Sequence, residues 1–239
     1  MSASRKRQEM TFPNPTTFPG GFTGPESDAE QLMMDLSEAG RLATTAALWI
    51  SWCVTHSFLN SEGYIGKAHF VGERFGPYYR LIYNAVAVTT LVLVFWLIPR
   101  DGEVSIWSWS GPLRLIQVSL WVASAGMFYL SFKWIGIWSF LGLSALGIGS
   151  RRGLPPAGLV TWGIYGIVRH PQFLAGLVIL WSRDLTDNAL VANVVLSLYL
   201  IIGARIEEKR LLVKYGEEYC RYMSEVPGFI PRSIRPSRR

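Results

Sequence analysis

Long apolar segments separated by short polar loops set the pattern of this chain. A helix needs about 20 predominantly apolar residues to cross the hydrocarbon core of a bilayer, and several segments approach that length. The expected helices cover about 42–59, 81–98, 113–132, 171–183 and 190–204. We therefore predict an all-α fold, a polytopic membrane helical bundle with about five transmembrane helices and a helical C-terminal cytoplasmic tail.

Two further segments lie outside these helices. Residues 134–148 are apolar but shorter than a full span and interrupted by glycines, which favours an interfacial or re-entrant segment over a crossing. Residues 1–37 are polar and rich in proline, which is typical of a disordered or loosely docked tail, and 28–36 are compatible with a short amphipathic helix. The expected units are this tail, a membrane domain over 38–232 and a basic tail over 233–239.

Composition favours a membrane protein over a soluble one. Half of the residues are hydrophobic, ten are tryptophan and 17% are charged. The net charge of +6 lies mostly in loops and the tail that flank the spans. A membrane surface is therefore a better partner for this positive charge than nucleic acid is. The two cysteines define no disulfide framework, and no Cys and His cluster has metal-ligand spacing.

Lysine and arginine are unevenly distributed between the two sides of the predicted bundle. Because cytoplasmic loops carry an excess of these residues, we expect the richer side to be cytoplasmic. That side is expected to hold Lys67, Arg74, Arg80, Lys133, Arg151, Arg152, Arg169 and the basic residues from Arg205 onward. The other side is expected to hold Arg5, Lys6, Arg7, Arg41, Arg100, Arg114 and Arg183.

A polar tripeptide interrupts the apolar C-terminal half. Arg169, His170 and Pro171 separate two apolar runs, and proline suits the first position of a helix because it lacks an N–H and has a fixed φ. Arg169 and His170 would then lie at a helix N-terminus, where backbone N–H groups and the helix dipole favour an anion. The simpler interpretation is that Arg169 only anchors the helix at the membrane interface.

A pair of glutamates follows the last apolar run. Glu207 and Glu208 are adjacent on a helix and about 100° apart, so both cannot face the same way. The two preceding helices form a hairpin, which brings this pair to the same side of the membrane as Arg169 and His170. The alternative is a charged interfacial turn balanced by Arg205, Lys209 and Arg210.

Together, the two stretches resemble the isoprenylcysteine carboxyl methyltransferase superfamily of small integral membrane methyltransferases. The order and spacing of both blocks agree over roughly 160–232, the part expected to hold the cofactor. Upstream, 55–61, 79–84 and 140–143 are similar to its methanethiol S-methyltransferase and NnrU-type branch. The matching residues are Tyr165, Arg169, His170, Pro171, Phe173 and Gly176, followed by Glu207, Glu208, Leu211, Tyr215, Gly216, Tyr219, Tyr222 and Pro231.

The resemblance implies a methyltransferase that uses S-adenosyl-L-methionine, bound between the fourth helix and the C-terminal tail. The acceptor would be small and apolar or lipid-like and would reach the site through the membrane, so membrane lipid is an expected partner. The branch favours a thiol of the methanethiol type. An isoprenylcysteine-type carboxylate and a phospholipid amine are the alternatives.

The polar groups of this donor suggest roles for the matching residues. Arg169 suits the carboxylate, and Glu207 or Glu208 suits the amino group or the ribose hydroxyls. His170 would bind the donor, position the acceptor or, as the less favoured role, act as a base. The expected catalytic residues are Arg169, His170 and Glu207. The expected cofactor-binding residues are Tyr165, Arg169, His170, Pro171, Gly176, Glu207, Glu208, Tyr219 and Tyr222.

One ionisable residue lies inside the first predicted helix. Ionisable groups at membrane depth are usually functional or paired, so His56, with Tyr83 and Asn84, is a candidate for contacting the acceptor. A hydrogen bond that packs two helices together is the alternative.

Two other functions are compatible with parts of the pattern. A membrane reductase of the sterol-reductase type shares the Arg-His-Pro block and uses NADPH, but its usual Asn-Tyr-x-Gly-Glu continuation is missing from 172–177. An accessory membrane protein of denitrification, of the NnrU type, would not be an enzyme. Binding of S-adenosylhomocysteine, of NADPH or of neither separates the three.

Overall fold

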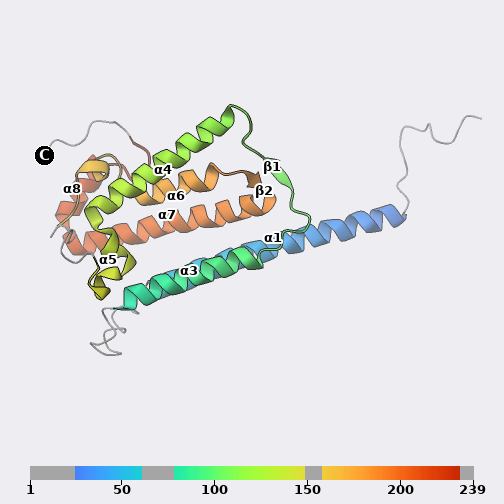
Figure 1. Ribbon diagram of the computed structural model, residues 1–239, viewed down its shortest axis with the longest axis horizontal. Coiled ribbons are helices and arrows are strands. Elements are labelled where there is room, and N and C mark those ends of the chain that lie inside the picture. The colour runs from blue at the N-terminus through green and yellow to red at the C-terminus, as the bar shows by residue number, and fades with distance from the viewer. Residues whose placement is uncertain (1–24, 61–77, 149–157, 232–239) are drawn as a thin grey trace, which may run out of the picture. The chain divides into compact units, whose positions relative to one another are not determined.

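Helices make up nearly all regular structure in the computed structural model, which describes residues 25–60, 78–148 and 158–231 (Figure 1). The longer helices are α1 (Pro25–Leu59), α3 (Tyr79–Leu97), α4 (Leu113–Ile135), α6 (Pro171–Trp181) and α7 (Asp187–Tyr215). The shorter elements are α5 (Ile137–Leu141), α8 (Glu217–Glu225), the 3-10 helices η2 (Leu143–Leu146) and η3 (Gly163–Gly166), and the strands β1 (Ser105–Trp107) and β2 (Leu185–Thr186). The all-α prediction is confirmed.

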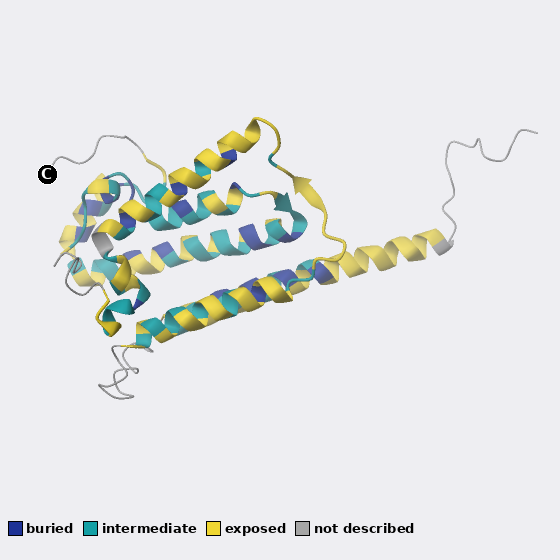
Figure 2. Ribbon diagram, viewed as in Figure 1, coloured by how far each residue is buried: buried dark blue, intermediate teal, exposed yellow. Residues whose placement is uncertain are grey.

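Four helices are long and apolar enough to cross a membrane. They cover Ser27–Leu59, Tyr79–Leu97, Leu113–Lys133 and Asp187–Tyr215; three of them contain a predicted span, and Tyr79–Leu97 ends one residue before the predicted span 81–98 does. Large apolar side chains such as Trp96 on α3 and Leu115 on α4 are exposed. Figure 2 shows exposed residues along the length of both helices. Apolar surface of this kind suits contact with lipid and supports a membrane protein.

The remaining predicted span forms a shorter helix than expected. α6 has 11 residues, which corresponds to about 16 Å and therefore to roughly half of the hydrocarbon core. A fifth crossing accordingly stays a prediction. The segment 134–148 forms the end of α4, then α5 and η2, and its described residues contain no helix long enough to cross.

The chain divides into two units, Met1–Gly40 and Arg41–Arg239. In the first unit, residues 25–40 form the first turns of α1, so the tail expected over 1–37 ends in a longer helix than the one considered over 28–36. Residues 1–24 and the tail over 233–239 lie outside the described residues. The site and all contacts discussed below belong to the second unit.

Two groups of helices pack against α7 in the second unit. α6 contacts both α4 and α7. Gly176 permits the close approach of α6, because a Cβ there would lie 3.3 Å from a methyl group of Leu200. Trp49 of α1, Val94 of α3 and Ala192 of α7 form a separate buried apolar cluster. α7 is therefore shared by both groups.

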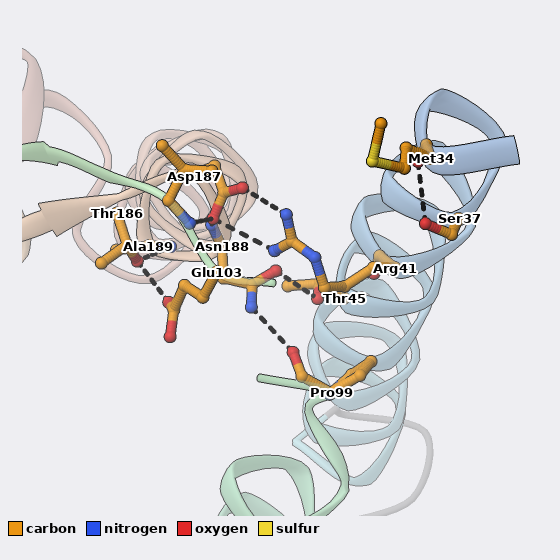
Figure 3. Close-up of polar contacts among 11 residues, drawn as sticks. Met34, Ser37, Arg41, Thr45, Pro99, Glu103, Thr186, Asp187, Asn188 and Ala189 are labelled. Carbon is orange, nitrogen blue, oxygen red and sulfur yellow. Dashed lines mark hydrogen bonds and ion pairs between the residues drawn. The ribbon is translucent and has the colours of Figure 1, made fainter. Parts of the chain in front are cut away.

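A buried polar cluster fixes the beginning of α7 (Figure 3). Both terminal guanidinium nitrogens of Arg41 contact the carboxylate of Asp187, which also accepts two backbone N–H groups. The Thr45 hydroxyl donates to the Asn188 side chain at 3.0 Å, and the Asn188 amide donates to the carbonyl of Pro99 at 2.8 Å. We call Arg41, Thr45, Asp187 and Asn188 the far cluster. It joins α1, the end of α3 and α7.

Candidate active site

The site is built where the beginning of α6 meets the C-terminal segment of the chain. Pro171 is the first residue of α6 and is buried, as its fixed φ and missing N–H favour. The backbone N–H of Arg169 donates to the carbonyl of Pro227 at 2.9 Å, and that of His170 donates to the carbonyl of Gly228 at 3.1 Å. We call 226–230 the strap. Its backbone is thereby held against the residues that precede α6.

A glycine turn brings the strap back to this position. Gly216 ends α7 with a φ of +55°, a conformation that glycine adopts without steric cost, and the chain then reverses into α8. Tyr219 and Tyr222 of α8 and Val226 of the strap form a buried cluster that packs on Leu211 and neighbouring residues of α7. The strap therefore folds back beside the glutamate pair.

Arg169 joins three segments at the centre of the site. Its Nε and Nη2 donate to Oε1 of Glu208 at 3.2 and 2.6 Å. Its Nη1 donates to the carbonyls of Met223, at 3.1 Å, and Val226. Both side chains of the ion pair are nearly buried, with exposed fractions of 10% and 8%. Arg169 thus holds the start of α6, the end of α7 and the strap together.

His170 lies between the two glutamates. Its Nε2 is 3.0 Å from Oε1 of Glu208, and its Nδ1 is 3.4 Å from Oε2 of Glu207. The ring is buried and packs against Phe173 and Phe229. Because both ring nitrogens face carboxylates, this geometry suits a positioning role better than exchange of a proton with a ligand.

The two adjacent glutamates differ as their 100° separation predicts. Glu208 is buried against Arg169 and His170, whereas the side chain of Glu207 is 47% exposed. The structure therefore brings together Arg169, His170 and both glutamates, which are far apart in the sequence. It also separates the glutamates by environment.

A hollow of about 420 Å³ opens beside this group, within the range of small-molecule sites in proteins. Two charged groups of α7, Arg205 and Glu208, face the strap across it. The hollow is lined by Arg169, Ala204, Arg205, Glu208, Pro227, Gly228, Phe229 and Ile230. Basic, acidic, aromatic and aliphatic groups thus converge on one space.

Three tyrosines expected at the cofactor are buried under the strap. The Tyr222 hydroxyl donates to the carbonyl of Tyr165 at 2.6 Å. The hydroxyls of Tyr165 and Tyr219 are buried, the first near Ser131 and Gln172 and the second near Arg169. Burial raises the pKa of Tyr219 to about 12 and also raises the pKa of Tyr165 and of Tyr222. None of these three tyrosines is among the described residues that line the hollow.

Gly176 and the upstream candidates lie elsewhere. A side chain at Gly176 would point toward Leu200 of α7, so this residue serves helix packing in the structure. His56 is hydrogen-bonded between the hydroxyls of Tyr83 and Tyr199, and the Asn84 amide donates to the carbonyl of Phe140 at 3.0 Å.

Helix geometry separates the His56 group from the hollow. Tyr199 precedes Glu208 by nine positions on α7, which places the two side chains about 180° apart around the helix. The structure therefore does not bring His56, Tyr83 and Asn84 to the hollow, and their contact with an acceptor stays a prediction. The hydrogen bonds of His56 match the alternative, because they join α1 to α3 and α7, and that of Asn84 joins α3 to α5.

Sequence reasoning missed Arg205 and Tyr199. Arg205 was considered only as a charge that balances the glutamates, although its position three residues before Glu208 places both on one face of a helix. Tyr199 lies in an apolar run with no neighbouring polar residue that would single it out.

The chain is similar to several proteins that are named methanethiol S-methyltransferase. Methanethiol S-methyltransferase from Pseudomonas deceptionensis is 29% identical over 65% of this chain and 60% of its own length. Methanethiol S-methyltransferase 1 from Bradyrhizobium diazoefficiens is 27% identical over 82% of this chain and 69% of its own length. The enzyme from Crocosphaera subtropica is 27% identical over 65% and 62%.

The chain spans about three fifths of the length of most of these relatives. No family model matches the chain. No solved structure matches it either.

Proposed function

We propose that this protein is an integral membrane methyltransferase that uses S-adenosyl-L-methionine to methylate a small apolar thiol of the methanethiol type. The observation that carries the proposal is the similarity to several methanethiol S-methyltransferases, at 26–29% identity. The arrangement of the hollow supports it, because charged groups of both signs and an aromatic strap surround a space of suitable size.

The residues of the hollow fit the polar groups of this donor. When bound, S-adenosyl-L-methionine would supply a methyl group on a sulfonium, with the neutral thioether S-adenosylhomocysteine as the leaving group and the thiol proton released to solvent. The protein then has to hold donor and acceptor in line and exclude water. Glu208 faces the hollow, Arg169 and His170 hold its carboxylate, and the strap with Phe229 covers one side.

The tyrosines and Glu207 complete the proposed donor site. Tyr219 and Tyr222 pack against Val226 of the strap, and Tyr222 holds the backbone at Tyr165, so these residues would support the donor site from behind. Glu207 is half-exposed beside His170, where it offers an acceptor at the entrance. The excess of basic residues expected on this side supports an entrance at the cytoplasmic face.

A thiol acceptor is consistent with the apolar character of the bundle. Methanethiol is small and uncharged, so it partitions into the membrane and needs no polar channel to reach the hollow. Ala204, Phe229 and Ile230 offer apolar contacts around the charged pair. An acceptor with a charged headgroup would need partners in addition to those that hold the donor.

A transfer assay tests the proposal. Detergent-purified protein is incubated with methyl-labelled S-adenosyl-L-methionine and, separately, methanethiol, an isoprenylcysteine analogue and phosphatidylethanolamine. We expect label in dimethyl sulfide and none above background in the other two products. Transfer only to the carboxylate or the amine would overturn the thiol assignment. Absence of transfer to all three, together with binding of NADPH, would favour the reductase class instead.

A further inference from the structure

The two carboxylate oxygens of Glu208 have unequal surroundings. Oε1 receives Nε and Nη2 of Arg169 and lies 3.0 Å from Nε2 of His170. Oε2 has one long contact, 3.4 Å to Nη1 of Arg205. Each carboxylate oxygen offers about two lone-pair sites, so Oε1 is saturated and Oε2 retains accepting capacity.

The two guanidinium groups that line the hollow also differ in their surroundings. Arg169 is nearly buried, and its donors are used by Glu208 and by two carbonyls of the C-terminal segment. Arg205 is 74% exposed, and its contact with Glu208 is the hydrogen bond that the structure describes for its side chain. A guanidinium carries five N–H donors in a planar fork that matches a carboxylate. Of the two, Arg205 is the group with donors to offer to a ligand.

We propose that Arg205 and Oε2 of Glu208 form a clamp for the zwitterionic α-amino acid end of the methyl donor. Arg205 binds the ligand carboxylate, and Oε2 accepts from the ligand ammonium. The inference rests on the proposed function, and it reassigns the carboxylate contact that the sequence suggested for Arg169.

Charge and geometry both favour an amino acid in this position. The two protein groups are oppositely charged and 3.4 Å apart, and the ammonium and carboxylate of an α-amino acid are attached to one carbon. Four alternating charges can therefore close into a ring of charge-assisted hydrogen bonds with no net charge left over. A ligand with only one of the two charges would leave one protein group without its new partner.

The supporting contacts fix the direction of the clamp. Arg169 and His170 hold Oε1, so Oε2 is the oxygen turned toward Arg205 and the hollow. Spacing of three residues on α7 keeps Arg205 over the same face as Glu208. Arg169 is thus a positioning residue, and Arg205 touches the ligand.

The clamp predicts which ligands depend on Arg205. S-adenosylhomocysteine carries the amino acid end, whereas 5′-methylthioadenosine has the same nucleoside and thioether without it. We expect Arg205→Ala to weaken binding of S-adenosylhomocysteine by about 10- to 100-fold, the range of a charge-assisted contact. Binding of 5′-methylthioadenosine is expected to stay within about twofold of wild type.

The test is a calorimetric titration. Purified wild-type, Arg205→Ala and Lys209→Ala proteins are each titrated with both ligands. Lys209→Ala is the matched control, because it removes one positive charge from an exposed position of the same helix that does not line the hollow. We expect this variant to bind both ligands as wild type does. Arg205→Lys keeps the charge without the fork and is expected to recover part of the lost affinity.

The outcomes separate this inference from the proposed function. If wild type binds S-adenosylhomocysteine and Arg205→Ala binds it equally well, the clamp is wrong and the donor assignment stands. Equal losses for both ligands in Arg205→Ala would also overturn the clamp, since the amino acid end would not be the group recognised. If wild type binds neither ligand, the proposed function itself fails. Displacement of S-adenosylhomocysteine by glycerophosphoethanolamine but not by L-methionine would assign the pair to a lipid headgroup and overturn the proposal.

Discussion

Two buried arginine–carboxylate pairs lie on α7, one at its first residue and one in its C-terminal part. They differ in how much hydrogen-bonding capacity their carboxylates leave unused. Asp187 in the far cluster binds Arg41 and backbone N–H groups through contacts to both oxygens. Glu208 is saturated at one oxygen and nearly open at the other. A hollow adjoins the second pair. The comparison separates a buried ion pair whose hydrogen-bonding capacity is used within the protein from one that leaves capacity beside a hollow, and the second is the pair that we propose binds the ligand.

The spacing of the pairs also fits a membrane. Asp187 and Glu208 are twenty-one positions apart on one continuous helix, which corresponds to about 31 Å. The hydrocarbon core of a bilayer is about 30 Å thick. The far cluster and the candidate site therefore suit the two membrane boundaries, one as a structural tie and the other as a ligand site.

The largest effect is expected at the site. Glu208→Gln removes the charge that Arg169, His170 and Arg205 share. We expect methyl transfer to fall about 100-fold, because a hydrogen bond between charged groups, here to the proposed ligand ammonium, contributes up to about 3 kcal/mol. The fall is measured as the initial rate of methyl transfer at saturating thiol. Retention of more than a tenth of the wild-type rate would contradict the role of Glu208.

The corresponding change in the far cluster should affect stability and spare binding. Asp187→Asn leaves the Arg41 guanidinium buried without its charged partner, which is expected to cost about 3 kcal/mol of unfolding free energy. The affinity of the folded protein for S-adenosylhomocysteine should not change. Denaturant unfolding and calorimetry on the same preparation check both parts. A tenfold loss of affinity would show that the two ends are coupled.

Removal of one hydroxyl from each of the two regions is expected to have a smaller effect on stability. Thr45→Val takes a donor away from the buried Asn188 side chain and should destabilise by about 1–2 kcal/mol. Tyr219→Phe removes a buried hydroxyl near Arg169, whose donors are already used by Glu208 and two carbonyls, so the change should be close to neutral without ligand. Thermal melts of both variants test this. Equal destabilisation by the two changes would contradict the difference between the clusters.

The smallest expected effect is a change in the stability of the protein at alkaline pH. Because burial raises the pKa of Tyr219 to about 12 from 10, its neutral form contributes stability below pH 10 that is lost as the pH rises toward 12. Tyr219→Phe should therefore lose less stability than wild type across this interval. Denaturant midpoints at pH 9 and pH 11, compared between the two proteins, give the difference. A larger loss in the variant would contradict the assignment.

The sequence predicted the helical segments and the pairing of the Arg-His-Pro block with the glutamates for a physical reason. Long apolar runs have few alternatives to membrane helices, and a hairpin of two such helices returns the chain to the same side. Thus Arg169 and Glu208 were expected to be near each other, and their side chains are 2.6 Å apart.

Other features depend on tertiary contacts that a linear pattern does not contain. The strap is positioned by backbone hydrogen bonds to Arg169 and His170, and backbone groups carry no sequence signal. For the same reason, the direction of the Arg169 side chain toward carbonyls of the C-terminal segment was not foreseen. The rotation of α7 likewise turns Tyr199, the partner of His56, away from Glu208, and contact of His56 with an acceptor stays a prediction.

One titration tests the central claim most directly. S-adenosylhomocysteine is titrated calorimetrically into wild-type, Asp187→Asn and Glu208→Gln proteins at equal folded concentration. The account predicts saturable one-site binding to the first two proteins with the same affinity and at least tenfold weaker binding to the third. Equal affinity in all three proteins, or loss of binding in Asp187→Asn alone, would contradict the claim that the donor binds beside Glu208.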